Sequence, residues 1–175
     1  MQKRIAVIGG GIIGATAAFY LGYLDQTQSL SVTLFDDDLG QATKAASGII
    51  SPWLSKRRNK RWYTLAKEGA AFYRKLVTDA NLGTNVYQQT GTIVTRKDPN
   101  DLDSLFQEAE IKLRHTPAMR SVALLSSLDV GKRLPFLTNP PAGILVEGGA
   151  KIDGLHFVEA LSLIHISEPT RLDVI

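Results

Sequence analysis

The sequence predicts an α/β fold that starts with a βαβ unit and then changes to a section richer in antiparallel strands. Residues 4–8 form a short, nearly all-apolar run that ends in three glycines, as expected of a strand buried on both faces of a parallel sheet. Residues 12–24 are apolar almost all round, which is typical of a helix packed beneath a sheet. Residues 31–36 alternate β-branched and apolar residues and predict the second strand.

The section after residue 40 does not repeat this βαβ pattern. A stripe of apolar residues at helical spacing predicts a helix whose core-facing residues are Trp62, Leu65, Gly69, Phe72 and Leu76. Four strands are expected at residues 85–89, 92–96, 121–125 and 142–147, the first two joined through Thr90 and Gly91. Two more helices are expected, one at 101–113 after the start signal Asp98-Pro99 and one at 154–160 with Asp153 as its N-cap.

Composition limits the class of protein. Of the 175 residues, 44% are hydrophobic and 21% charged, a balance typical of a globular chain. No apolar run approaches the roughly 20 residues of a membrane span, and the chain enters its first strand without room for a signal peptide. The absence of cysteine excludes disulfides, thiolate metal sites and cysteine nucleophiles. We therefore expect a cytoplasmic protein without a metal site, since His115 and His156 lack metal-ligand spacing.

The net charge is +3, and the basic residues gather at 56–61. A nucleic-acid or membrane patch is one reading of this cluster. A solvated loop that leads into a helix is the reading we favour, because a single short cluster is a weak signal. No nucleic-acid partner is expected.

The last fifteen residues, 161–175, resemble the translation of a transposase-type sequencing adapter, with residues 161–171 matching it one by one. Sequence of that origin is excluded from reasoning about the fold. We therefore treat residues 161–175 as an artefact and expect the native protein to continue differently after about Ala160.

Three glycines carry the strongest functional signal. Gly9, Gly11 and Gly14 match the pattern G-x-G-x-x-G between a predicted strand and a predicted helix. In a Rossmann-like fold the first glycine makes the tight turn, the second allows a pyrophosphate to approach the backbone, and the third lets helix and strand pack closely. The pyrophosphate would then lie at the amino end of the helix, beside Ile12 and Ile13.

An acidic residue lies at the position where this mode of dinucleotide binding requires one. Asp36 ends the second predicted strand, 22 residues after Gly14, and its carboxylate can accept hydrogen bonds from the ribose hydroxyls of an adenosine. A carboxylate here disfavours a 2′-phosphate. Asp37 and Asp38 could share the role, although a solvated turn is the reading we favour for them.

Residues 40–53 give a second signal. Small residues and hydroxyls in this segment could form a tight loop against a flat ligand, and they would fit an ordinary surface loop equally well. Together with the glycine pattern they favour a dinucleotide site, with FAD favoured over NAD because the antiparallel section interrupts the βαβ order.

Several segments resemble the D-amino-acid oxidase and glycine oxidase superfamily of FAD-dependent oxidoreductases. The specific ones are GGGIIGATAA, VTLFDDD and GQATKAASGIISPW, and the later VYQQTGTIV and ILVEGGAKIDGLHFVEAL are also similar. The resemblance runs from Ile5 to about Ala160. It implies that the segment after the second strand contacts the flavin diphosphate and the isoalloxazine ring, through Thr43, Ala46, Ser47, Gly48 and Ile49.

The resemblance also implies a domain order and a chemistry. Residues 1–82 would be the first segment of the FAD-binding domain, 83–147 the first part of an inserted antiparallel substrate domain, and 148–160 the return to the FAD-binding domain. The chemistry would be hydride transfer from the α-carbon of a small amino acid or amine to the flavin. The family's carboxylate-binding arginine and nearby tyrosine lie in its carboxy-terminal half. No catalytic residue is therefore assigned here, and Arg57, Tyr63 and His115 are not given that role.

Two alternatives stay open at this point. The first is an NAD-dependent dehydrogenase that uses the same βαβ unit. The chain could also be a non-catalytic stump that binds nucleotides weakly, since apolar faces of a sheet or helix need a covering layer.

Overall fold

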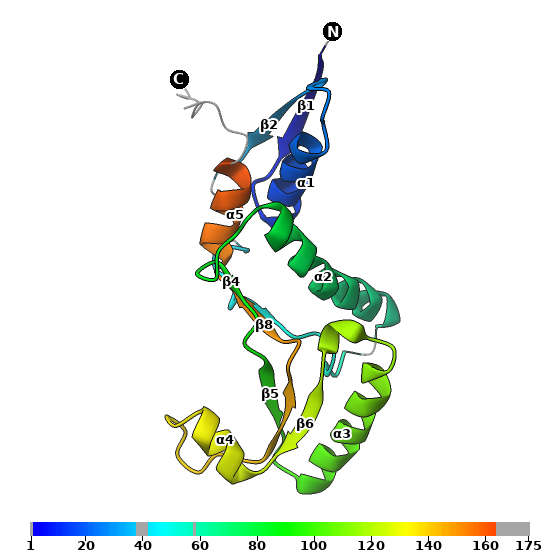
Figure 1. The fold of residues 1–175 in the computed structure, drawn as a ribbon, viewed down its shortest axis with the longest axis vertical. Helices are drawn as coiled ribbons and strands as arrows, with labels where there is room; N and C mark the ends of the chain where they lie inside the picture. The colour runs from blue at the N-terminus through cyan, green and yellow to red at the C-terminus, as the bar shows by residue number, and fades with distance from the viewer. Residues whose placement is uncertain (1, 38–41, 58, 164–175) are drawn as a thin grey trace. The chain divides into compact units, whose positions relative to one another are not determined.

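The computed structural model describes residues 2–37, 42–57 and 59–163 (Figure 1). The chain forms two compact units. The first comprises Met1–Gly48, Ala80–Val86 and Asp153–Ile175, and the second comprises Ile49–Asp79 and Tyr87–Ile152. The chain therefore leaves the first unit twice and returns to it twice.

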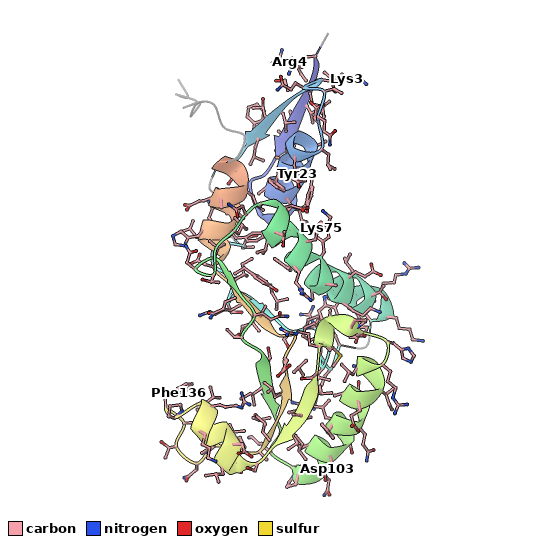
Figure 2. All side chains as sticks on the ribbon, in the orientation of Figure 1. Lys3, Arg4, Tyr23, Lys75, Asp103 and Phe136 are labelled. Carbon is pink, nitrogen blue, oxygen red and sulfur yellow. The ribbon has the colours of Figure 1, made fainter. Side chains whose placement is uncertain are left out.

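The first unit is built on the predicted βαβ motif. Strands β1 (Lys3–Ile8) and β2 (Leu30–Phe35) pair in parallel, from Lys3 opposite Leu30 to Ile8 opposite Phe35. Helix α1 (Ile12–Tyr23) connects them and buries its side chains Ala15, Ala18 and Phe19. The exposed side chains of Lys3 and Arg4 mark the start of β1 (Figure 2). The two strands and the helix between them are confirmed within one residue of their predicted bounds.

Helix α5 (Gly154–Leu163) packs against α1 and completes the described part of this unit. The sequence predicted an end at Ala160, and the helix continues for three residues. Phe157, Val158 and Leu161 are each at most 2% exposed, so burial of the Leu161 side chain favours the extra turn. The rest of the segment that resembles an adapter, residues 164–175, lies outside the described residues.

The second unit contains a three-stranded antiparallel sheet with the order β5-β7-β6. Its strands are β5 (Thr92–Thr95), β6 (Val122–Leu125) and β7 (Gly143–Val146). All four residues of β7 are buried. Helix α3 (Pro99–Leu113) contributes Leu102 and Ala109 to the cluster that contains Ile144 and Val146. Helix α4 (Ser127–Arg133) contributes Val130 to the cluster of Leu125 and Leu145, so helices cover both faces of this sheet (Figure 1).

A smaller antiparallel sheet has the order β3-β8-β4, with β3 (Ile49–Ile50), β4 (Tyr87–Gln88) and β8 (Ala150–Ile152). Helix α2 (Lys60–Asp79) and the 3₁₀ turn η1 (Pro117–Met119) complete the unit. Ala70 of α2 and Met119 of η1 join the same core cluster as Trp53. This cluster is the main core of the second unit.

Four elements were not predicted from the sequence: β3, β8, α4 and η1. The two strands have two and three residues and take their register from distant partners, so no local pattern marks them. Helix α4 begins with a capping bond in which Ser126 Oγ accepts from the Asp129 N–H at 3.2 Å, a signal that the proline-rich loop after it obscured. Strands β4 and β5, although joined through Thr90 and Gly91, belong to different sheets.

The compact units divide the chain differently from the predicted segments. Ile49–Asp79, which the sequence assigned to the first segment at 1–82, lies with the second unit. The return to the first compact unit begins at Asp153, and the domain order 1–82, 83–147 and 148–160 stays a prediction. A hydrogen bond of 2.9 Å from the Asp153 N–H to the Val86 carbonyl joins the two re-entering segments. No helix in the described ranges combines the length and the apolar character that crossing a membrane requires.

Replacement of Ile144 by alanine is expected to lower the free energy of unfolding by about 2–5 kcal/mol, because the side chain is fully buried and its removal leaves a cavity. Urea unfolding followed by far-UV circular dichroism measures the change. Ile111→Ala on α3 is the matched control, since Ile111 is 61% exposed and should change stability by no more than about 0.5 kcal/mol. Equal losses in the two variants would contradict the proposed core.

Candidate functional site

A tight turn joins β1 to α1. Gly9 has a φ of +97°, a conformation that favours glycine because residues with a Cβ atom rarely adopt it. Its N–H donates a hydrogen bond of 2.7 Å to the carbonyl of Phe35, the last residue of β2. The turn is therefore fixed at the carboxyl ends of both parallel strands, where ligands bind in open α/β sheets.

Gly14 brings α1 close to this turn. A Cβ atom on Gly14 would overlap the carbonyl oxygen of Gly9, so no larger residue fits without a shift of the backbone. This is the close packing of helix and strand that the glycine pattern predicted.

The amino end of α1 is free of acidic residues in its first turn. The Ala15 N–H makes the first helical bond, 2.9 Å to the Gly11 carbonyl, so the earlier amides point out of the helix end. One of them, Ile12 N–H, donates to Thr43 Oγ1 at 3.1 Å. The amides of Ile13 and Gly14 belong to the same positive end of the helix, which favours an anion.

Asp36 lies directly after β2, and its side chain covers Gly10. A Cβ atom on Gly10 would stand 2.6 Å from Asp36 Oδ2, so the carboxylate and the glycine turn are in contact distance. Lys44 Nζ lies 3.9 Å from the same oxygen. Gly10 and Lys44 were not among the predicted site residues, because each is placed by a contact with a residue far along the chain.

The remaining predicted site residues make fewer contacts with the turn between β1 and α1. Ala46 N–H donates to the Thr43 carbonyl at 3.3 Å, and Gly48 has a φ of +69°. Ser47 is exposed, and so is Asp37 after the end of β2. Ile49 lies in β3 of the second unit. Asp38, Gly40 and Gln41 lie outside the described residues.

The start of α5 supports the loop that carries Thr43. A Cβ atom on Gly154 would overlap the Thr43 carbonyl oxygen, so α5 begins against the backbone of this loop. The predicted N-cap is confirmed, because Asp153 Oδ1 accepts a bond of 3.0 Å from the His156 N–H. Thr43 thus contacts both helices of the unit through one loop, and Gly154 is a site-supporting residue that the sequence pattern did not reveal.

The side chains of His156 and Asp153 form an exposed ion pair, with Nδ1 and Oδ2 2.9 Å apart. This hydrogen bond raises the pKa of His156 above 6.5 and lowers the pKa of Asp153 below 3.8. The histidine contributes stability below its unfolded pKa, and that contribution is lost as pH rises through the raised folded value. The aspartate contributes above its unfolded pKa, and its contribution is lost as pH falls through the lowered folded value.

Across the described residues, no three side chains of His, Cys, Asp or Glu gather in a way that could hold a metal ion. The described site is therefore built from backbone amides, one carboxylate, one hydroxyl and one amino group.

The variant Gly14→Ala is expected to have a free energy of unfolding lower by about 1–3 kcal/mol, because the new methyl group displaces α1 from the Gly9 carbonyl. Urea unfolding measures this change. Gly69→Ala is the control within a helix, since a Cβ atom there meets nothing within 4 Å and alanine favours the helical backbone. If both variants unfold like the parent chain, the proposed close packing is wrong.

The variant Asp153→Asn should bring the pKa of His156 down toward its ordinary value, because the hydrogen bond to a carboxylate is lost. Titration of the imidazole C–H signals by NMR measures this pKa. An unchanged pKa of His156 in the variant would rule out the ion pair.

The chain is 34% identical over 158 residues to the uncharacterized oxidoreductase YurR of Bacillus subtilis, which covers 87% of this chain and 41% of that protein. It is 25% identical over 133 residues to the glycine oxidase of the same species, covering 74% of this chain and 33% of that protein. The crystal structure of iminodiacetate oxidase from Chelativorans sp. BNC1 superposes with a TM-score of 0.83 at 28% identity, over 94% of this chain and 44% of that one.

The chain spans less than half the length of these relatives. The family model described as FAD dependent oxidoreductase matches residues 4–163, which include the glycine turn, Asp36 and both helices of the first unit. This match decides between the two dinucleotides considered for the βαβ unit, and the cofactor is FAD. The chain belongs to the family of FAD-dependent oxidoreductases.

Proposed function

We propose that the chain supplies the ADP-binding part of an FAD-dependent enzyme that oxidises a small amino acid or amine. One observation carries this proposal: the glycine turn, the amino end of α1 and the Asp36 carboxylate meet at one edge of the β1–β2 sheet. The diphosphate and the adenosine ribose of FAD need these groups side by side.

The site has space for such a ligand. A Cβ atom on Gly9 would meet nothing within 4 Å, and one on Gly11 would meet only Thr43 Oγ1 at 3.5 Å. A diphosphate can therefore approach the backbone of the turn, where the amides at the start of α1 would donate to its oxygens.

Each residue near the turn has a proposed role. The backbone of Gly9, Gly11, Ile12, Ile13 and Gly14 would hold the diphosphate. Asp36 would accept hydrogen bonds from the ribose hydroxyls, with Asp37 beside it. Lys44, whose Nζ lies 3.9 Å from Asp36 Oδ2, would add positive charge beside that carboxylate. Contacts of Thr43, Ala46, Ser47, Gly48 and Ile49 with the remaining flavin stay a prediction.

The names of two relatives support the substrate class. Glycine and iminodiacetate each have a nitrogen and a carboxylate on the same carbon. Bound FAD would supply the hydride acceptor for oxidation of the bond between that carbon and nitrogen. The small substrate would be an amino acid or amine of this kind, in a protein that we still expect to be cytoplasmic. This chain's own contribution would be to fix the ADP end of the cofactor.

The isolated chain is expected to be inactive. Its parallel sheet has two described strands, and Ile8 and Ile13 beside the turn are 80% and 84% exposed. Apolar side chains at such a position usually pack against a further layer of protein or a ligand. We therefore propose that this chain alone binds nucleotides only weakly and that turnover needs the complete enzyme.

Anaerobic mixing of the complete, flavin-loaded enzyme with glycine or iminodiacetate is expected to bleach the visible absorption of the oxidised flavin, because the amine delivers a hydride. Glycolate, which replaces the amine of glycine with a hydroxyl, is the matched control and should leave the spectrum unchanged. The 175-residue chain, incubated with FAD and the same amines, should show no bleaching.

Bleaching by glycolate but by neither amine would reject the substrate class while leaving the cofactor assignment intact. A complete enzyme that is purified colourless and takes up no FAD would reject the cofactor role of the glycine turn itself. Amine-dependent bleaching by the isolated chain would reject its expected inactivity.

A further inference from the structure

A hollow of about 780 Å³ lies within the second unit, apart from every residue proposed to hold FAD. Its walls come from the loop before α2, the first turns of α2, the residue after β5 and one side of α3. Five basic side chains line it together with two acidic ones: Lys56, Arg57, Lys60, Arg96 and Lys112, with Asp101 and Glu108. Three of these basic residues belong to the cluster at 56–61, for which the sequence favoured a solvated loop.

The positive charge in this hollow is only partly neutralised. Lys112 Nζ lies 2.6 Å from Glu108 Oε1 and donates to the Trp53 carbonyl at 2.7 Å, so this cation is fully engaged. Within the described ranges, no carboxylate forms an ion pair with Lys56, Lys60 or Arg96. Cations held near one another without counter-charges create a field that attracts anions.

Two further features border the same space. Tyr63 lines the hollow, and its hydroxyl is buried without a hydrogen-bond partner among the described residues. Buried hydroxyls are normally paired, so this one is an unused donor beside the hollow. Asn59 caps α2 by accepting the Trp62 N–H at 3.1 Å, and the first turn of α2 contains no acidic residue. The start of this helix therefore adds to the positive field.

We propose that this hollow binds a small molecule that carries at least two carboxylate or phosphate groups. The cations come from four separate segments, so they can contact two anionic groups at once. Guanidinium groups such as Arg96 pair with either kind of oxyanion. The volume falls in the range of roughly 300–1,000 Å³ typical of small-molecule sites. The proposal does not depend on the assignment of FAD, because none of these residues is part of the first unit.

A nucleic-acid strand fits this site less well. Asp101 and Glu108 stand in its wall and would repel a continuous phosphate backbone. A concave, partly acidic hollow of this size suits a compact dianion better than an extended polymer.

The two tryptophans of the chain allow a direct test. The Arg57 guanidinium lies 4.9 Å from the centre of the Trp62 ring, so a ligand that moves Arg57 should change the intrinsic fluorescence. Citrate and inorganic pyrophosphate, added to the full chain at constant ionic strength, are the probes for carboxylate and phosphate. At least one of them is expected to give a saturable change, and the better of the two identifies the anionic group.

The double variant Lys60→Gln and Arg96→Gln should weaken this binding by about tenfold or more, because two charged contacts are lost. The matched control is Arg61→Gln with Lys97→Gln, which removes the same charge from the neighbouring positions outside the hollow. Thermal unfolding followed by circular dichroism checks that both double variants are folded. If the variant with Lys60→Gln and Arg96→Gln is unfolded, the two single variants replace it.

Equal weakening in both double variants would overturn the site in favour of general charge screening. No saturable response to either probe would overturn the proposal, and so would a response to a single-stranded oligonucleotide alone.

Discussion

The contact between Gly14 and the Gly9 carbonyl is the constraint on which the first unit depends. It fixes how closely α1 approaches the end of β1, and this approach places the amino end of the helix beside the turn. Gly9 in turn is tied to the end of β2 through the Phe35 carbonyl, which brings Asp36 over Gly10. One backbone contact thus positions the helix end and the carboxylate together.

The loop of Thr43 extends this arrangement to the last described helix. Thr43 accepts a hydrogen bond from the start of α1, and its carbonyl lies against Gly154 at the start of α5. Segments more than a hundred residues apart therefore meet at one loop. Along the sequence, the last segment of the first unit follows the residues of the second unit. The core of the second unit is formed by the sheet between α3 and α4. The glycine turn lies in the first unit and the basic hollow in the second.

Local sequence patterns predicted the elements that interactions between residues close in sequence determine. Hydrophobic periodicity over a few residues predicted β1 and α1, and a capping signal predicted the N-cap Asp153. The spacing of the glycines predicted the roles of Gly9 and Gly14 in the turn. Gly10, Lys44 and Gly154 were missed because their environment is set by Asp36 and Thr43 across the fold. The short strands β3 and β8 were missed for the same reason, and so was the gathering of Lys60, Arg96 and Lys112 around one hollow.

In the proposed complex a diphosphate lies across the glycine turn and the Asp36 carboxylate contacts the ribose. Titration of the ¹⁵N-labelled chain with ADP, followed by amide NMR, measures whether these groups bind the nucleotide. We expect the largest shift changes at the amides of Gly11, Ile13, Gly14 and Asp36, and inorganic phosphate alone should leave the amide of Asp36 unaffected. Shift changes confined to the second unit, or none at saturating ADP, would contradict the proposed complex.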